Sequence, residues 1–388
     1  MIARPLATAV VGLALATGLA GCGSWNPLVW VGIMSDNEPN KPTPLGPVTG
    51  KVLPKAVWIS QVGKASGFGF RPDVQDGRIY AASEEGAVVT LEEESGKIVS
   101  RVDTKKKLSS GIEAGEGRLI VGTLKGEVLA YDAATGKEVW TSSVAGEVIS
   151  PAAISRKTVV VRTADGRIFG LAIEDGKRRW VFQRPMPALL LRSESGVKAI
   201  DQNVVAGFAN GKMIALDIAD GTLVWEVTVA QPRGATDLER ITDVAGLPIV
   251  DGANVCAAAF QAKVACFEIQ SRNQIWSREL STALPLANDA RYVYVVDDKG
   301  AVQALDKGSG ASVWKQDKLL YRRLTAPLVV AGVVVVGDGF GYLHVLSTED
   351  GSLVGRLATD GSAILSMVPA AGGVVVQTAK GAVALVRF

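Results

Sequence analysis

Residues 126–140 read GEVLAYDAATGKEVW, and this stretch decides the fold. The apolar run that includes Val128 and Ala130 is typical of a β-strand, and the D-A-A-T-G cluster after it is typical of a tight turn. The last residues, ending at Trp140, begin a second strand. The stretch therefore predicts a β-hairpin.

The same fifteen-residue unit recurs seven times without a gap, beginning at residues 86, 126, 166, 211, 262, 300 and 341. Glycine occupies the eleventh position of every unit except one, where Arg272 stands. A turn residue with positive φ favours glycine, because glycine has no Cβ to clash with the backbone.

The segments between units each contain two more β-rich runs, such as residues 117–124 and 157–164. Four strands in a repeat of roughly 40 residues are typical of a propeller blade. The chain ends in GAVALVRF at 381–388, which matches the first half of the unit, and PKAVW at 54–58 matches the second half. We therefore predict an all-β, eight-bladed propeller over residues 51–388, closed by an N-terminal strand that joins the three C-terminal strands.

Tryptophan ends the unit in most blades. We expect these rings to pack between adjacent sheets, and an aromatic ligand-binding box is the alternative. The tryptophans are Trp58, Trp140, Trp180, Trp225, Trp276 and Trp314, with Ser100 and Gly355 in the other two places.

The N-terminus has the composition of an export signal. Residues 1–21 place one arginine before a short apolar stretch, and the sequence L-A-G-C ending at Cys22 resembles the lipobox of bacterial lipoproteins. The alternative is an ordinary signal peptide followed by a chance cysteine. The resemblance implies a mature chain that begins at a lipidated Cys22, and the proline-rich residues 22–50 predict a flexible tether to the propeller.

The remaining composition argues against several kinds of chemistry. The formal charge is only +2, so nucleic acid is not an expected partner. The single histidine, and the absence of a Cys-x-x-Cys or phosphate-binding loop, give no pattern for a metal or cofactor. We predict no catalytic residues, no metal site and no cofactor.

Two cysteines stand ten residues apart on one predicted hairpin. If Gln261 and Ala262 form a two-residue turn, Cys266 faces Ala257, and a disulfide with Cys256 needs a bulge or a loop of odd length. An oxidising compartment would favour the disulfide, so the sequence leaves this question open.

Two consecutive connections between units are longer than the others, at 30 residues for 181–210 and 36 for 226–261 against 23 to 27 elsewhere. Connections of this type lie on one face of a propeller, so the two loops should lie side by side. Apolar residues bordered by charges are typical of protein interfaces, which predicts a docking surface. The alternative is that the leucines pack on the propeller itself. The candidate partner-binding residues are Leu189, Leu191, Arg192, Glu239, Arg240 and Asp243.

The order of the three leucines gives a finer expectation. Along an extended chain Leu189 and Leu191 point to one side and Leu190 to the other. We therefore expect a partner to meet Leu189 and Leu191, while Leu190 packs against the propeller.

Two levels of resemblance can be named from these motifs. The A-x-D-x-x-T-G-K-x-x-W pattern at 130–140 resembles the pyrroloquinoline-quinone-type propeller repeat. The runs M-P-A-L-L-L-R at 186–192, D-L-E-R-I-T-D-V at 237–244, R-R-L-T-A-P at 322–327 and G-D-G-F-G-Y-L-H at 337–344 resemble the BamB family of the outer-membrane β-barrel assembly (BAM) machinery.

The resemblance implies that the two loops bind the periplasmic POTRA domains of BamA, with Leu189, Leu191, Arg192 and Asp243 as contacts. One departure from the family pattern is Ala245, where the family has a second aspartate. Part of the charged contact is therefore missing in this chain.

We expect a non-enzymatic scaffold subunit of the BAM complex, anchored by lipid at the periplasmic face of the outer membrane of a Gram-negative bacterium. Such a subunit would assist the folding and insertion of β-barrel proteins, with unfolded outer-membrane proteins as further candidate partners. The alternative is a periplasmic propeller that binds a quinone or another small molecule.

The lipoprotein hypothesis predicts the behaviour of Cys22→Ser. Each buried CH₂ of a lipid chain contributes about 0.8 kcal/mol to membrane binding, so loss of the acylated cysteine should release a folded propeller into the periplasm. Fractionation of cells that express the variant measures this. Recovery of Cys22→Ser in the membrane fraction at the wild-type level would refute the lipid anchor.

Overall fold

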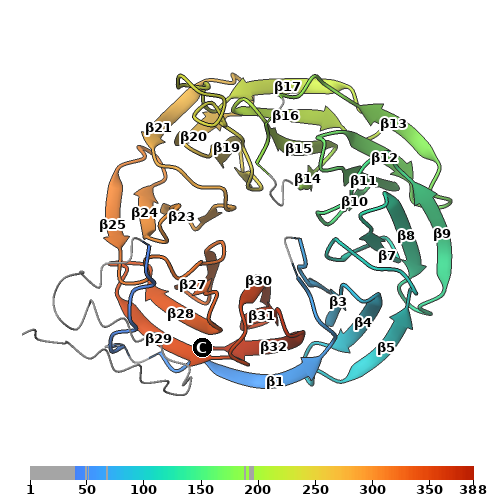
Figure 1. The fold of residues 1–388 in the computed structure, drawn as a ribbon, viewed down its shortest axis with the longest axis horizontal. Coiled ribbons are helices and arrows are strands. Elements are labelled where there is room, and N and C mark those ends of the chain that lie inside the picture. The colour runs from blue at the N-terminus through green and yellow to red at the C-terminus, as the bar shows by residue number, and fades with distance from the viewer. Residues whose placement is uncertain (1–39, 49, 51, 67–68, 188, 192–195) are drawn as a thin grey trace, which may run out of the picture. The chain divides into compact units, whose positions relative to one another are not determined.

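The fold is a closed ring of eight four-stranded antiparallel sheets (Figure 1). The computed structural model describes residues 40–48, 50, 52–66, 69–187, 189–191 and 196–388. Within these residues every regular element is a strand, and no helix is long and apolar enough to span a membrane. The prediction of an all-β, eight-bladed propeller is confirmed.

Each blade runs from an inner strand at the central axis to an outer strand at the rim. Blade 1 comprises β2 (Asp73–Gln75), β3 (Arg78–Ala82), β4 (Ala87–Glu92) and β5 (Ile98–Asp103), and blade 2 comprises β6 (Glu113–Gly115), β7 (Arg118–Gly122), β8 (Glu127–Asp132) and β9 (Glu138–Ser143). Blade 3 comprises β10 (Ala153–Ser155), β11 (Thr158–Arg162), β12 (Ile168–Ala172) and β13 (Arg178–Phe182), and blade 4 comprises β14 (Val197–Ile200), β15 (Asn203–Phe208), β16 (Lys212–Asp217) and β17 (Leu223–Thr228).

The second half of the ring continues in the same order. Blade 5 comprises β18 (Ile249–Asp251), β19 (Asn254–Ala258), β20 (Lys263–Glu268) and β21 (Gln274–Glu279), and blade 6 comprises β22 (Ala287–Asn288), β23 (Tyr292–Val296), β24 (Val302–Asp306) and β25 (Ser312–Gln316). Blade 7 comprises β26 (Leu328–Val330), β27 (Val333–Gly337), β28 (Tyr342–Ser347) and β29 (Leu353–Ala358), and blade 8 comprises β30 (Ile364–Ala370), β31 (Gly373–Thr378), β32 (Ala382–Arg387) and β1 (Lys55–Gln61).

Blade 8 closes the ring with strands from both ends of the chain. The N-terminal strand β1 is its outer strand and pairs with β32, with Lys55 opposite Arg387 and Gln61 opposite Ala382. This pairing confirms the predicted closure. It also covers an edge of β32 that an open ring would leave exposed to other strands.

Five of the six tryptophans that end a unit face a small residue on the neighbouring strand of their own sheet, and the sixth, Trp58, faces Leu385. These cross-strand pairs are Trp140 with Ala130, Trp180 with Gly170, Trp225 with Ala215, Trp276 with Cys266 and Trp314 with Ala304. A small partner leaves room for the indole ring to lie flat between two blades.

Five of the six rings also contact the turn glycine of the following blade; after Trp225 that turn position is Arg272. The indole N–H of Trp180 donates to the carbonyl of Ile218 at 3.1 Å, and a Cβ built on Gly221 would lie 2.5 Å from the ring. The same pair of contacts joins Trp58 to Gly96, Trp140 to Gly176, Trp276 to Gly310 and Trp314 to Gly351. The tryptophans therefore pack between blades, as predicted.

The N-terminal segment before β1 packs on blades 6 and 7. The Thr43 N–H donates to the carbonyl of Leu320 at 3.0 Å, and Val52 N–H donates to that of Val354 at 3.1 Å. The buried Arg322 donates to the carbonyl of Thr43 at 3.2 Å. Contacts with the propeller thus begin before residue 51, so part of the segment predicted as a flexible tether is fixed to the ring.

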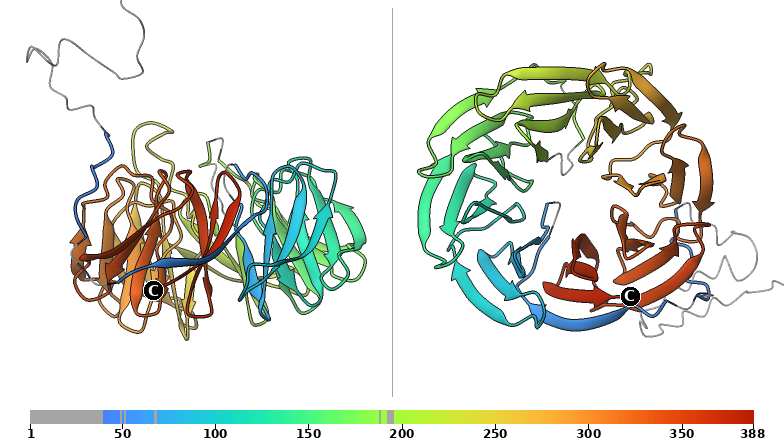
Figure 2. Two further views of the ribbon diagram at one scale, coloured as in Figure 1. Left: turned by 90° about the horizontal axis from the view of Figure 1, so that it is seen from below. Right: turned by 180° about the vertical axis from the view of Figure 1, so that it is seen from behind.

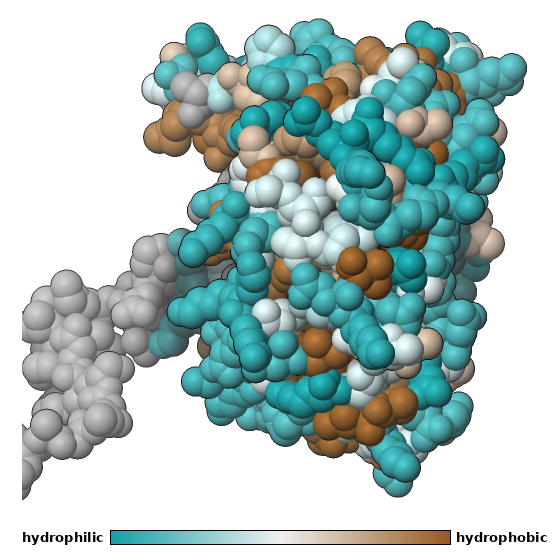
Figure 3. Space-filling view, turned by 90° about the vertical axis from the view of Figure 1, so that its right-hand side faces the viewer, coloured by the Kyte–Doolittle hydropathy of each residue, from teal (hydrophilic) through white to brown (hydrophobic). Residues whose placement is uncertain are grey.

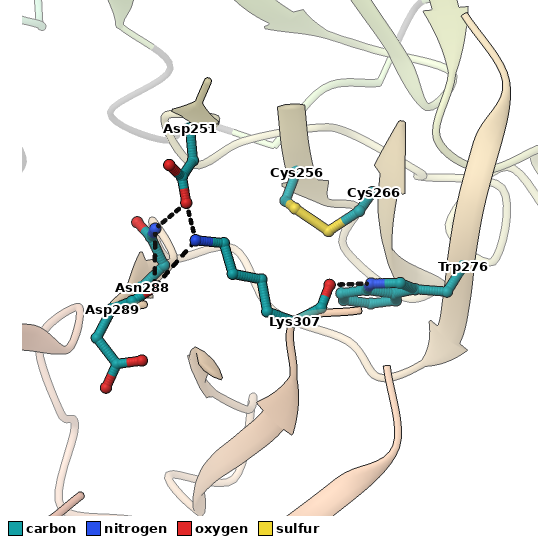
Figure 4. The surroundings of a disulfide bond; sticks show 7 residues. All are labelled: Asp251, Cys256, Cys266, Trp276, Asn288, Asp289 and Lys307. Carbon is teal, nitrogen blue, oxygen red and sulfur yellow. Dashed lines mark hydrogen bonds and ion pairs between the residues drawn. A yellow bond between two sulfur atoms is a disulfide. The ribbon is translucent and has the colours of Figure 1, made fainter. Parts of the chain in front are cut away.

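Cys256 and Cys266 are paired directly and form a disulfide. The two-residue turn assumed from the sequence was wrong by one position, because Ala259 N–H bonds to the carbonyl of Lys263 and three residues form the loop. Its middle residue, Gln261, takes a positive φ of 53°. The bond lies beside Trp276, whose indole N–H donates to the carbonyl of Lys307 (Figure 4).

The contact between ring and glycine predicts different costs for two similar substitutions. Gly221 and Gly77 have similar positive φ values of 74° and 70°. Gly221→Ala would press a methyl group into the Trp180 ring, whereas the methyl group of Gly77→Ala would meet nothing within 4 Å. Both variants pay for positive φ, but only Gly221→Ala should also lose about 1 to 3 kcal/mol through overpacking. Urea unfolding of the two variants measures the difference, and equal losses would show that the ring contact contributes nothing.

Candidate docking site

The two long loops connect the outer strand of one blade to the inner strand of the next. Residues 183–196 join β13 to β14, and residues 229–248 join β17 to β18. Both loops lie on the same face of the ring, and the loop after β17 rises beyond the strands (Figure 2). The prediction that they lie side by side is confirmed by a direct hydrogen bond between them, from Leu191 to Asp243.

The second loop returns along the edge of blade 4 before it enters blade 5. Val244 N–H donates to the carbonyl of Phe208 at 3.0 Å, and Phe260 N–H donates to the carbonyl of Asp243 at 2.9 Å. A Cβ at Gly207 would lie 2.2 Å from the Val244 carbonyl oxygen, so only glycine permits this approach. Backbone bonds on both sides therefore fix the position of Asp243.

Asp243 lies beneath the surface and joins the two loops. Its side chain is only 6% exposed, and its Oδ2 accepts the backbone N–H of Leu191 at 2.7 Å. Burial raises the pKa of Asp243, while hydrogen bonds from Leu191 and Asn210 and the charge of Arg162 oppose this shift. The sequence predicted Asp243 as a partner contact; its buried position instead suits a residue that holds the 183–196 loop.

Arg162, which was not predicted from the sequence, is the cation whose charge acts on Asp243. It ends β11, is 6% exposed, and donates through Nη1 to the carbonyl of Gly207 at 2.5 Å. Its guanidinium lies over the Phe208 ring at 4.7 Å from the centroid. Burial lowers the pKa of Arg162 to about 10, and Asp243 partly offsets this. The sequence does contain a signal for this residue, because an arginine that ends the apolar run T-V-V-V-R indicates a charge at the end of a buried strand.

A pocket of about 210 Å³ opens between the loops and the ring. Its walls come from connections and turns of blades 2 to 5 on the loop face, with Arg162 and Asp243 as its charged residues. The apolar lining includes Ile149, Met186, Leu190, Leu191, Phe208 and Val244. We call this space the Arg162 pocket.

The three leucines do not alternate as the sequence predicted. Leu189 is 43% exposed, in agreement with the expectation, but Leu190 and Leu191 are both half-buried and line the Arg162 pocket. The segment is not an extended strand, because the bond from Leu191 to Asp243 draws its backbone inward. The neighbouring candidate, Arg192, lies outside the described residues.

Glu239 and Arg240 lie on the exposed tip of the second loop and bond within it. The Glu239 carboxylate accepts hydrogen bonds from the backbone N–H groups of Ala235 at 2.8 Å and Thr236 at 3.1 Å. These bonds, the one from Thr236 most strongly, lower the pKa of Glu239. Arg240 Nε donates to the carbonyl of Gly234 at 3.0 Å. Both side chains therefore shape the loop while remaining accessible.

Ala245, where the resemblance implied a missing surface charge, is buried. The side of the molecule seen in Figure 3 shows separate apolar patches on a mostly hydrophilic surface, and such scattered patches are usual on protein surfaces. In the described part of the chain, no cluster of three or more His, Cys, Asp or Glu residues could hold a metal.

The link between the loops predicts a difference between two changes at Asp243. Asp243→Asn keeps an oxygen that can accept the Leu191 N–H, whereas Asp243→Ala removes it. Hydrogen exchange at the Leu191 amide should therefore accelerate at least tenfold in Asp243→Ala, which corresponds to about 1.4 kcal/mol, and much less in Asp243→Asn. Unchanged protection in Asp243→Ala would show that this bond does not hold the loop.

Comparison with known proteins gives the family. A sequence profile described as "Outer membrane protein assembly factor BamB" matches residues 84–316. A protein of that name from Nitrosomonas eutropha is 45% identical over 84% of this chain and 80% of its own. The crystal structure of BamB from Moraxella catarrhalis superposes with a TM-score of 0.81 at 26% identity, covering 87% of this chain and all of that one.

Other solved structures share the fold alone. A quinohemoprotein alcohol dehydrogenase from Comamonas testosteroni has a TM-score of 0.69 at 14% identity, covering 86% of this chain and 76% of that one. Its likeness extends to the propeller and carries no activity to this chain. By sequence profile, by identity to relatives and by structure, the chain belongs to the BamB family of outer-membrane protein assembly factors.

Proposed function

We propose that this protein is a non-enzymatic scaffold subunit of the BAM complex that docks on the POTRA domains of BamA through the two long loops. The observation that carries the proposal is the bond from Leu191 to Asp243, which holds the loops together and leaves Leu189 exposed beside a pocket. An ordered apolar contact next to a polar rim is the usual centre of a protein interface. Arg192, Glu239 and Arg240 supply the rim in this proposal.

The segment before β1 is fixed to the propeller. Residues 42–48 lie on the same face of the ring as the two loops (Figure 2). Arg322 and Arg356 hold this segment through the carbonyls of Thr43 and Gly46. In this proposal a lipid at Cys22 anchors the protein at the periplasmic face of the outer membrane.

The alternative function is a quinone-binding or formerly catalytic propeller. The quinone dehydrogenases that the repeat resembles use a vicinal cysteine pair, whereas Cys256 and Cys266 lie on neighbouring strands of one blade. Absorption spectra and metal analysis of the purified protein separate the two functions. A stoichiometric quinone or metal would favour the alternative.

A single leucine tests the docking surface. Leu189→Ala removes an exposed side chain without opening a core cavity, so it should weaken capture of the BamA POTRA domains by about 1 to 2 kcal/mol, or roughly five- to thirtyfold, with an unchanged melting temperature. The matched control is Leu124→Ala, which removes a somewhat more exposed leucine (53% against 43%) from a blade 2 turn. Equal binding by both variants in a titration would place the docking surface elsewhere.

A further inference from the structure

We propose that the Arg162 pocket binds a carboxylate side chain of the docked partner, an aspartate or glutamate of the BamA POTRA domains, through the guanidinium of Arg162. The inference rests on the proposed function and deepens it, since it assigns a specificity site to the same surface. Arg162 belongs to blade 3 and not to either loop, so the partner would contact the ring itself.

Arg162 has unused hydrogen-bonding capacity. A guanidinium has five N–H donors, and within the described residues its one hydrogen bond is from Nη1 to the carbonyl of Gly207. Asp243 affects it only by charge at longer range, because its carboxylate is held by the backbone N–H groups of Leu191 and Asn210. Its remaining nitrogen atoms are not among the buried unpaired side-chain atoms of the described residues, so they reach the space of the pocket and can donate to a further acceptor there.

The size and the lining of the pocket suit an acidic side chain. Its volume of about 210 Å³ far exceeds the roughly 30 Å³ that one water occupies, so a side chain can enter. Met186, Leu190 and Phe208 supply apolar walls for the methylene groups of an acidic side chain. A carboxylate matches the fork of a guanidinium with two parallel hydrogen bonds.

The neighbouring Asp243 can tolerate a second carboxylate in the pocket. A second carboxylate beside an ionised aspartate would meet repulsion. Burial already raises the pKa of Asp243, so the approach of another negative charge shifts it further toward the neutral form. Asp243 can then keep its bond from Leu191, since a protonated carboxyl still has an acceptor oxygen.

Phosphate groups and nucleotides fit this pocket less well. A phosphate needs several donors from different groups, whereas Arg162 is the one cationic side chain among the described residues that line the pocket, and most of that lining is apolar. The pocket is also continuous with the surface that exposes Leu189. A docked polypeptide can therefore place an apolar residue on Leu189 and an acidic one on Arg162 at the same time.

The experiment combines a charge scan of the partner with substitution of Arg162. Each Asp or Glu of the purified BamA POTRA domains is changed to Asn or Gln, and binding to the wild-type protein is titrated. The titrations are repeated with Arg162→Met, which removes the guanidinium that lies over Phe208 but keeps an unbranched apolar side chain, and with Arg162→Lys, which keeps the charge. Arg167→Met is the matched control, since Arg167 lies on the adjoining turn of blade 3 and pairs with Asp165 outside the pocket.

We expect one POTRA acid-to-amide change to weaken wild-type binding about ten- to hundredfold and to have no further effect on Arg162→Met. Arg162→Lys should bind between wild type and Arg162→Met, and Arg167→Met should bind as wild type.

Three results would overturn the inference. If no acid-to-amide change weakens binding to the wild-type protein, no partner carboxylate enters the pocket, and this holds even if Arg162→Met fails to fold. If Arg162→Met melts and binds as wild type, Arg162 is not the receptor, although the proposed docking stands. If the wild-type protein does not bind the POTRA domains at all, both proposals fall.

Discussion

The contact between a tryptophan ring and the turn glycine of the next blade holds the ring of sheets together. Each core of the propeller lies between two neighbouring sheets: the cluster around Trp180 combines Val160 of blade 3 with Leu216 of blade 4. The indole N–H satisfies a carbonyl of the next blade, and the glycine has no Cβ to hold the ring away. Because the ring is closed, a loosened interface strains its neighbours, and the loops on one face are held by a stiff base.

Two interfaces between blades have Ser100 or Gly355 in place of tryptophan, and there the residue on the neighbouring strand is larger. The residues opposite five of the tryptophans are alanine, glycine or cysteine, whereas Thr90 lies opposite Ser100 and Val345 lies opposite Gly355. At Gly355 the space is taken by the chain itself, since a Cβ there would lie 2.8 Å from the carbonyl oxygen of Val52. The missing ring therefore makes room for the segment that leads to the proposed lipid anchor.

The sequence predicted the architecture because its determinants are local. Turn glycines and tryptophans recur at fixed positions in each unit, and the split unit at the two ends specifies how the ring closes. The disulfide register was not predictable in this way. Both a two-residue and a three-residue loop are compatible with the sequence around Gln261, and the observed hydrogen bond from Ala259 to Lys263 selects the three-residue loop.

The docking site was predictable only in outline. Loop lengths showed where the chain departs from its repeat, and Leu189 is exposed as expected. The inward course of Leu191 depends on Asp243, whose own position depends on backbone bonds to Phe208 and Phe260, which are distant in sequence. Arg162 was not predicted for the same reason. Its place in the pocket depends on the two long loops, which the fold brings over the end of β11.

These buried charges explain how a loop can serve as a rigid contact. Ordering a free loop on binding costs conformational entropy that subtracts from affinity. The bond from Leu191 to Asp243 orders the loop before the partner arrives, and Arg162 offsets part of the cost of burying that carboxylate. Arg162 in turn keeps N–H donors that reach the pocket in the free protein. An acidic side chain of the partner can accept from these donors, so in this proposal the ring beneath the docking loops also contributes to affinity.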